Sequence, residues 1–211
     1  MASLILHTCI AKLVKDRLEL DDRYYIGNIL PGILCKKGIL KAESHYMNTI
    51  ELDGKVINIP DIDKFERENK CELKSKDNSI SLGYLSHLLQ DKIWYEQFIP
   101  KFVAYAENGS VIYQNDNTKH TLEEFLKDIY LDYAYVDKYI IQKYNVDIVQ
   151  IKKEMLRNTQ DKYFSAIDKY FEVAIPQVDR INSFITVEDT ERYLEKCLEA
   201  TLNKLRKYGV K

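Results

Sequence analysis

The feature that most constrains the fold is the segment 77–102, whose apolar residues cover nearly the whole circumference of a helix. A helix of that kind is buried on all sides, so we predict that it is the central helix of the domain. Ser79 or Ser81 is expected to cap its start, and Pro100 to end or kink it. The chain holds only 7 Gly and 4 Pro, and few breakers favour helices elsewhere too. The predicted fold class is all-α, a single-domain helical bundle.

Apolar residues at helical spacing predict further helices on both sides of the central segment. Pro31-Gly32 is expected to stop one of them, whereas Thr121 and the pair Thr186 and Asp189 are expected to cap two others. The segment 51–60 has two open interpretations, a short hairpin or an irregular loop, and 108–119 is predicted to be a loop. The predicted helices cover residues 2–18, 23–30, 61–70, 122–144, 146–157, 160–172 and 176–184, followed by a last helix that starts after Thr186.

Charge and cysteine content exclude several classes of protein. Lys plus Arg number 31 and Asp plus Glu number 33, a net charge of -2, which gives no electrostatic reason to expect a nucleic-acid partner. No apolar run is long enough for a transmembrane segment, and the N-terminus is a poor signal peptide. We therefore expect a soluble cytoplasmic protein with reduced thiols. The cysteines form no close pair and stand at Cys9, Cys35, Cys71 and Cys197.

His87 and Asp91 are the first candidates for a chemical site. They stand four residues apart on the central helix, so both side chains lie on one face, one turn apart, where they can bind one metal ion. A buried helix has little reason to carry this pair unless something satisfies both groups. The alternatives are a simple hydrogen bond between His87 and Asp91, or an exposed helix face.

The surroundings of this pair resemble a known family. The matching residues occur in order: a histidine in the first helix, a Gly-x-x-x-Pro segment, a Ser-His-Tyr segment, the central Gly-Tyr-x-x-His-x-x-x-Asp-x-x-Trp helix, and an acidic segment further on. In these respects the chain resembles the zinc-dependent phospholipase C family, close to its small intracellular bacterial members described as hydrolases, within the S1/P1 nuclease-like superfamily. The matching positions are His7, 27–32, 44–46, Gly83, Tyr84, His87, Asp91, Trp94 and 130–139.

The resemblance implies a zinc site. His45, His87 and Asp91 would hold one zinc ion, and His7 with Asp91 would form part of a second site. Metal-activated water would then hydrolyse a small phosphoester or a phospholipid head group. The metal-site portion would span about residues 1–140 of a single domain 1–211, with C-terminal helices at about 146–208. Four further side chains are candidates to line the pocket or to orient the imidazoles, namely Tyr84, Trp94, Asp132 and Asp137.

The chain also departs from the family. The family turn ends in Pro-Asp, and that Asp binds metal or acts as a base, whereas this chain has Pro31-Gly32 and leaves Asn28 as the nearest polar side chain. The two candidate catalytic residues are therefore Asp91 and Asn28. His120 and Glu124 have a ligand-like spacing, but we interpret them as a coincidental solvated pair. The alternative function is a catalytically degenerate helical protein that binds metal or a partner.

Overall fold

The structure, a computed structural model, describes residues 2–52, 55–106, 110–158, 165–169, 171 and 184–211. It is 67% helical and 10% strand, so the prediction of a predominantly helical fold is confirmed, although two small sheets accompany the helices. The particular bundle type stays a prediction. The described helices are α1 (Leu4–Lys15), α2 (Arg23–Lys36), α3 (Lys41–Ser44), α4 (Ile62–Glu68), α5 (Lys70–Lys74), α6 (Ser79–Ile93), the π-helix η1 (Trp94–Phe98), α7 (Ile99–Phe102), α8 (Leu122–Lys143), α9 (Ile148–Arg157) and α11 (Val187–Arg206).

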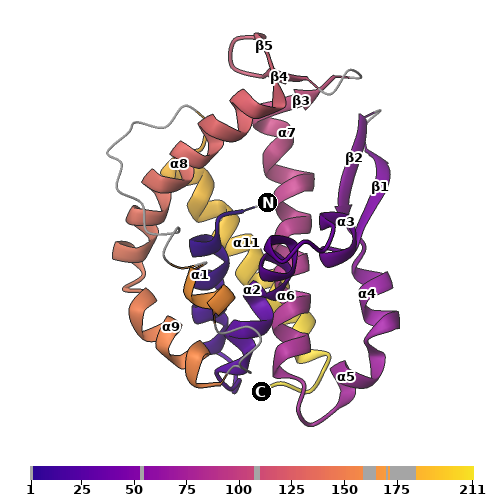
Figure 1. The fold of residues 1–211 in the computed structure, drawn as a ribbon, viewed down its shortest axis with the longest axis vertical. Coiled ribbons are helices and arrows are strands. Elements are labelled where there is room, and N and C mark those ends of the chain that lie inside the picture. The colour runs from indigo at the N-terminus through magenta and orange to yellow at the C-terminus, as the bar shows by residue number, and fades with distance from the viewer. Residues whose placement is uncertain (1, 53–54, 107–109, 159–164, 170, 172–183) are drawn as a thin grey trace.

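The segment predicted to be the central helix forms α6, and its continuation changes helix type at Trp94, where η1 begins. Helix α6 runs through the middle of the molecule and packs against α1, α2 and α11 (Figure 1). Its N-cap is Asn78 without a side-chain hydrogen bond, so the predicted serine caps are wrong. Pro100 lies in the first turn of the short helix α7, where its missing N–H costs nothing.

Helix α2 does not stop at Pro31-Gly32 but continues to Lys36, so the predicted stop is wrong. Proline inside a helix removes one backbone hydrogen bond and costs about 3 kcal/mol. Here Ile29 and Ile33, on either side of the proline, are each only 1% exposed. Burial of two such side chains contributes about 1.5–3 kcal/mol each, which offsets the cost and keeps the helix intact.

Two small antiparallel sheets extend from the helical body (Figure 1). The segment 51–60, which had two possible interpretations, is part of a hairpin in which Ile50 pairs with Ile57. The predicted loop at 108–119 is wrong in part, because Val111 lies opposite both Tyr105 and His120 in a three-stranded sheet. The strands are β1 (Met47–Leu52), β2 (Lys55–Pro60), β3 (Val103–Tyr105), β4 (Val111–Tyr113) and β5 (Lys119–His120).

Two helices of the C-terminal part, α8 and α11, begin at the capping residues that the sequence predicted. Thr121 and Glu124 form a reciprocal capping box at the start of α8, and the Thr186 side chain accepts a hydrogen bond from the Asp189 N–H at the start of α11. Helix α9 confirms the prediction for 146–157, whereas those for 160–172 and 176–184 lie largely outside the described residues. Among the described helices, none combines the length and the apolar character that crossing a membrane requires.

Helices α2 and α6 approach each other through two glycines. A Cβ built on Gly83 would stand 2.2 Å from the Tyr24 carbonyl oxygen and 2.7 Å from the Asn28 nitrogen. One built on Gly27 would stand 2.0 Å from the Ile80 carbonyl oxygen. Both glycines are therefore required because the two backbones touch, and no side chain fits between them.

We expect Gly83→Ala to destabilise the protein by at least about 2 kcal/mol, because the new methyl group forces the two helix backbones apart. Helix propensity alone predicts the opposite sign, a gain of about 1 kcal/mol for Ala over Gly. Urea unfolding of this variant beside Ser81→Ala, on the same helix, measures the difference. A neutral or stabilising Gly83→Ala would contradict the close approach of α2 and α6.

Candidate metal centre

Four predicted ligands from three parts of the chain lie near one another inside the molecule, and three of them, His7, His87 and Asp91, form one compact group. His7 comes from α1, His45 directly follows α3, and His87 and Asp91 come from α6. The exposed fractions of these four side chains are 2%, 0%, 1% and 0%, in that order. The structure therefore brings together residues that are up to 84 positions apart (91 minus 7) in the sequence.

The two oxygens of Asp91 face different histidines. Oδ1 lies 3.3 Å from Nε2 of His7, whereas Oδ2 lies 3.6 Å from Nε2 of His87 and 3.8 Å from Nε2 of His45. Ligand atoms about 2.0–2.1 Å from a tetrahedral zinc ion stand about 3.3–3.4 Å from one another. The separations around Asp91 are close to that value. One potential ligand atom from each of His7, His87 and Asp91 also lies within 4.8 Å of the other two.

The atoms that face the centre have lone pairs to offer. Nε2 of His7, Nε2 of His87 and Oδ2 of Asp91 are buried and have no hydrogen-bond partner among the described residues. Buried polar atoms are rarely left in this state, because desolvation costs about 1–3 kcal/mol per unpaired group. The arrangement therefore fits a divalent transition metal, whose preferred ligands are imidazole nitrogens and carboxylate oxygens.

The other ring nitrogen of each histidine has a partner that orients the imidazole. Nδ1 of His87 lies 2.7 Å from the backbone carbonyl oxygen of Asn28. A carbonyl oxygen can accept a hydrogen bond but cannot donate one. Nδ1 must therefore carry the proton, and Nε2 is left free to bind metal. Nδ1 of His7 lies 2.6 Å from Oε1 of Gln90, and Nδ1 of His45 lies 2.9 Å from Oγ of Ser44.

Burial and neighbouring charges lower the pKa values of two of the histidines, His87 and His45. Burial, together with the neighbouring His7, lowers the pKa of His87 to about 4. Burial and the neighbouring His87 lower the pKa of His45 to about 3. The rings of His7 and His87 stack with centroids 3.9 Å apart, and such stacking excludes two positive charges. Burial acts to raise the pKa of Asp91, but His7 and His87 hold it well below its ordinary value, so the carboxylate is ionised.

The remaining predicted site residues lie in different surroundings. Asn28 is fully buried, and both polar atoms of its side chain have no hydrogen-bond partner among the described residues. Tyr84 donates a hydrogen bond to the Ser44 carbonyl oxygen and so fixes the residue before His45. Trp94 is a core residue that stacks on Phe98, with centroids 5.8 Å apart.

The two aspartates of α8 hold other segments in place. Asp132 accepts hydrogen bonds from the backbone N–H groups of Phe184 and Ile185, at 2.8 and 3.1 Å. Asp137 accepts one from Oγ of Ser3 at 2.5 Å. The Ser3 side chain also caps α1 by accepting from the Leu6 N–H. The link from Asp137 to Ser3 therefore ties α8 to the start of the helix that carries His7.

Sequence reasoning missed the groups that orient the imidazoles. Gln90 precedes Asp91 and Ser44 precedes His45, but neither residue type signals this role by itself. The Ala2 backbone N–H, which donates to Asp91 Oδ1 at 3.3 Å, was not predicted either. His120 and Glu124 lie on the surface 3.8 Å apart, away from the group formed by His7, His87 and Asp91.

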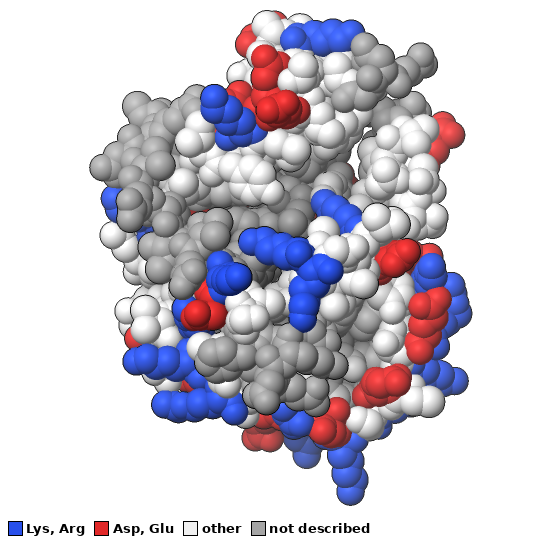
Figure 2. Space-filling view, in the orientation of Figure 1, with Lys and Arg blue, Asp and Glu red and all other residues white. Residues whose placement is uncertain are grey.

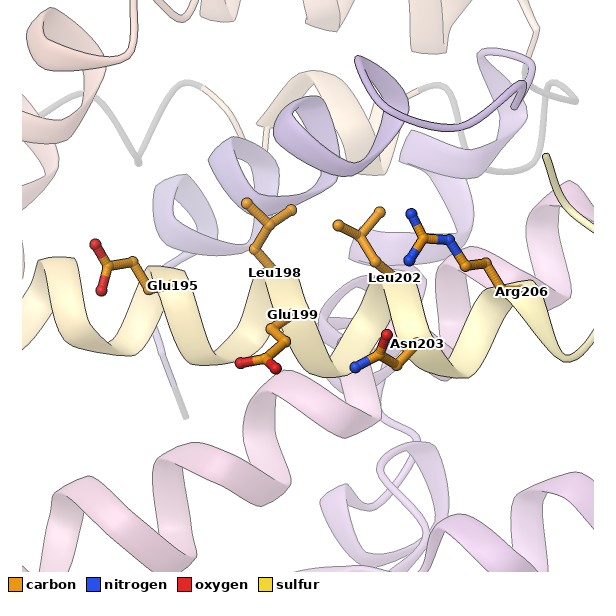
Figure 3. A pocket seen from close by; sticks show the side chains of 6 residues that line it. All are labelled: Glu195, Leu198, Glu199, Leu202, Asn203 and Arg206. Carbon is orange, nitrogen blue, oxygen red and sulfur yellow. The ribbon is translucent and has the colours of Figure 1, made fainter.

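A shallow surface pocket lies on α11 (Figure 3). Its side chains project from that one helix, with two leucines flanked by charged and amide groups. None of the predicted site residues lines it, so it does not belong to the metal centre. The lining residues are Glu195, Leu198, Glu199, Leu202, Asn203 and Arg206.

Comparison with known proteins gives no independent assignment. The chain matches no protein-family model, and no curated protein or solved structure is similar enough to it to count as a match. The assignment of this centre therefore depends on its own geometry.

The buried Asp137 supplies a pH prediction. Burial raises its pKa from 3.8 to about 8, although the Ser3 hydrogen bond acts to lower it. The folded state thus binds the Asp137 proton more tightly than the unfolded state does. The contribution of this proton to the free energy of unfolding is therefore complete below pH 3.8 and is lost as the pH rises to about 8. We expect Asp137→Asn, which keeps a neutral acceptor, to raise the melting temperature at pH 8 by several degrees and by less at pH 5.

Thermal unfolding of wild type and variant from pH 5 to pH 8 makes the measurement. Asp63→Asn serves as the control, because Asp63 is exposed on α4. A difference between Asp137→Asn and wild type that stays constant over this range would contradict a buried, protonated Asp137.

Proposed function

We propose that the protein is a metal-dependent hydrolase of phosphoesters that uses zinc or a related divalent metal. The observation that carries the proposal is the approach of His7, His45 and His87 to Asp91. Three buried atoms of this group, Nε2 of His7, Nε2 of His87 and Oδ2 of Asp91, have no hydrogen-bond partner among the described residues. The sequence resemblance to the zinc-dependent phospholipase C family supports the same reaction class. His45, His87 and Asp91 would hold one ion, and His7 with Asp91 would contribute to a second.

A bound zinc ion lowers the pKa of a coordinated water toward ~7 and neutralises charge on a phosphoryl oxygen. The chain's own residues orient the imidazoles that would bind this ion. The Asn28 carbonyl fixes the ring of His87, and Ser44 fixes the ring of His45. Because the ligands are nearly fully buried, bulk water does not weaken the electrostatic interactions of the centre.

A second candidate is a protein of the same fold that binds metal without turnover. The specific observation in its favour is that Gly32 lies inside α2, where the family would place an aspartate. Asp91 is then the only carboxylate in the ligand group found among the described residues. Asn28, the nearest polar side chain on the same helix, is an amide, which accepts protons poorly.

The metal-binding part is tested by metal analysis of purified protein. We expect about one or two zinc ions per chain in the wild type, and a loss of at least about tenfold in zinc affinity in His87→Ala and Asp91→Asn. His120→Ala is the matched control, since His120 is a partly exposed histidine outside the group. Equal zinc content in all four proteins, with circular dichroism showing intact helices, would exclude the proposed ligands.

The catalytic part is tested with bis(p-nitrophenyl) phosphate as the substrate. We expect zinc-dependent release of p-nitrophenol that a chelator abolishes and added zinc restores, because the reaction needs the ion's charge at the phosphoryl oxygen. Zinc binding without measurable turnover of this ester, of glycerophosphocholine or of phosphatidylcholine vesicles would favour the binding protein over the hydrolase.

A further inference from the structure

Lys41 and Tyr95 lie one helical turn from two of the proposed ligands. Lys41 stands four residues before His45, and its carbonyl oxygen accepts the His45 N–H at 2.9 Å. Tyr95 stands four residues after Asp91, in the π-helix that continues α6. The two side chains meet, because Nζ of Lys41 donates to Oη of Tyr95 at 2.6 Å and lies 5.2 Å from the centre of the ring.

The pair lies closer to solvent than the ligands do. Lys41 and Tyr95 are partly exposed, whereas His45 and Asp91 are fully buried. The hydrogen bond from Lys41 to Tyr95 therefore joins the segment that leads to His45 with the segment that follows Asp91, at a point nearer the surface than either ligand.

Basic side chains are also common around the part of the fold that contains α2 and α3. Lys and Arg gather in the middle of the space-filling view, over the region where Figure 1 shows α2 and α3 (Figures 1 and 2). In the sequence, Lys36 and Lys37 end α2, and Lys41 begins α3. Grouped basic side chains attract anions, even on a chain whose overall net charge is -2.

We propose that Lys41, held in place by Tyr95, binds a non-bridging oxygen of the phosphoryl group that the metal centre receives. An ammonium group has three N–H donors and Tyr95 accepts one, so the others can reach an anionic oxygen. Tyr95 limits the freedom of the flexible lysine side chain, which lowers the entropy lost on binding. This inference rests on the proposed function and adds a recognition residue that the sequence did not predict.

The competing explanation is structural, namely that Lys41 only fastens α3 to η1 and so positions His45. The two explanations differ in what a variant loses. A positioning role predicts that Lys41→Gln loses zinc, whereas a recognition role predicts that zinc stays bound and anion binding weakens.

The experiment uses the full-length, zinc-loaded protein with inorganic phosphate as the probe, and calorimetry measures binding. We expect Lys41→Gln to weaken phosphate binding about tenfold with unchanged zinc content, and Lys41→Arg to recover most of the loss, because the charge returns. Lys101→Gln is the matched control: Lys101 is exposed, and its ammonium lies 4.5 Å from the ring centre of Phe98 in the same π-helix. This control should bind phosphate like the wild type.

Several results would overturn the inference: wild type that does not bind phosphate, Lys41→Gln that binds it equally well, or Lys41→Gln that loses its zinc. Tyr95→Phe is the second variant, which keeps the ring and removes the acceptor; it should bind phosphate more weakly than wild type and more tightly than Lys41→Gln. Equal binding in Tyr95→Phe and wild type would remove Tyr95 from the proposal.

Turnover separates this inference from the proposed function. Lys41-dependent phosphate binding without hydrolysis of bis(p-nitrophenyl) phosphate, glycerophosphocholine or phosphatidylcholine would leave the recognition site in place and contradict the hydrolase. Hydrolysis with the same KM in Lys41→Gln and wild type would support the hydrolase and contradict the recognition role of Lys41. Parallel binding of glycerophosphocholine and phosphatidylcholine vesicles identifies the source of the phosphoryl group, and a Lys41 dependence in either supports the site.

Discussion

The contact between the backbones of α2 and α6 is the constraint on which the rest of the structure depends. Gly27 and Gly83 leave no room for a Cβ, so the two helices lie closer together than side chains would permit. Asn28 follows Gly27 on α2, and its carbonyl oxygen reaches Nδ1 of His87, one turn after Gly83. The helix crossing and the orientation of a proposed ligand are therefore one feature, and a change in one displaces the other.

Asp91 is the second point on which the structure converges. It faces His7 through one oxygen and His45 and His87 through the other, and it accepts the Ala2 N–H as well. Nε2 of His7, Nε2 of His87 and Oδ2 of Asp91 are buried without a hydrogen-bond partner among the described residues, which costs free energy that leucines at the same positions would not cost. Binding of an ion to the folded state alone would recover that free energy and raise the stability by mass action.

Local signals in the sequence predicted the elements that local interactions determine. The capping box of Thr121 and Glu124 lies within four residues, and α8 begins where it indicated. Pro31 misled the prediction because what keeps α2 helical is tertiary burial of Ile29 and Ile33, which no local pattern reveals. The π-helix after Ile93 and the pairing of Val111 with His120 were missed for the same reason, since a single-sequence pattern contains neither.

The candidate site divides in the same way. The spacing of His87 and Asp91 on a buried helix and the ordered match to a family predicted side chains that the structure brings together. Gln90, Ser44 and Lys41 were not predicted, because glutamine, serine and lysine are ordinary surface residues until a fold gives them partners. Asp137 was expected near the imidazoles, but its described hydrogen bond is to Ser3, 134 residues away in sequence.

The charges of the centre favour an anionic substrate over a neutral one. The neutral imidazoles of His45 and His87 and the single carboxylate of Asp91 offset only one of the two positive charges of a divalent ion. The loaded centre would keep a net positive charge, to which Lys41 adds another at its edge. A buried positive charge is costly unless an anion accompanies it, and a phosphoryl group supplies that anion in a geometry that both the ion and the ammonium can contact. A neutral ester or amide would bring no negative charge of its own, so the charge balance of the loaded centre would favour a phosphoester, in agreement with the proposed function.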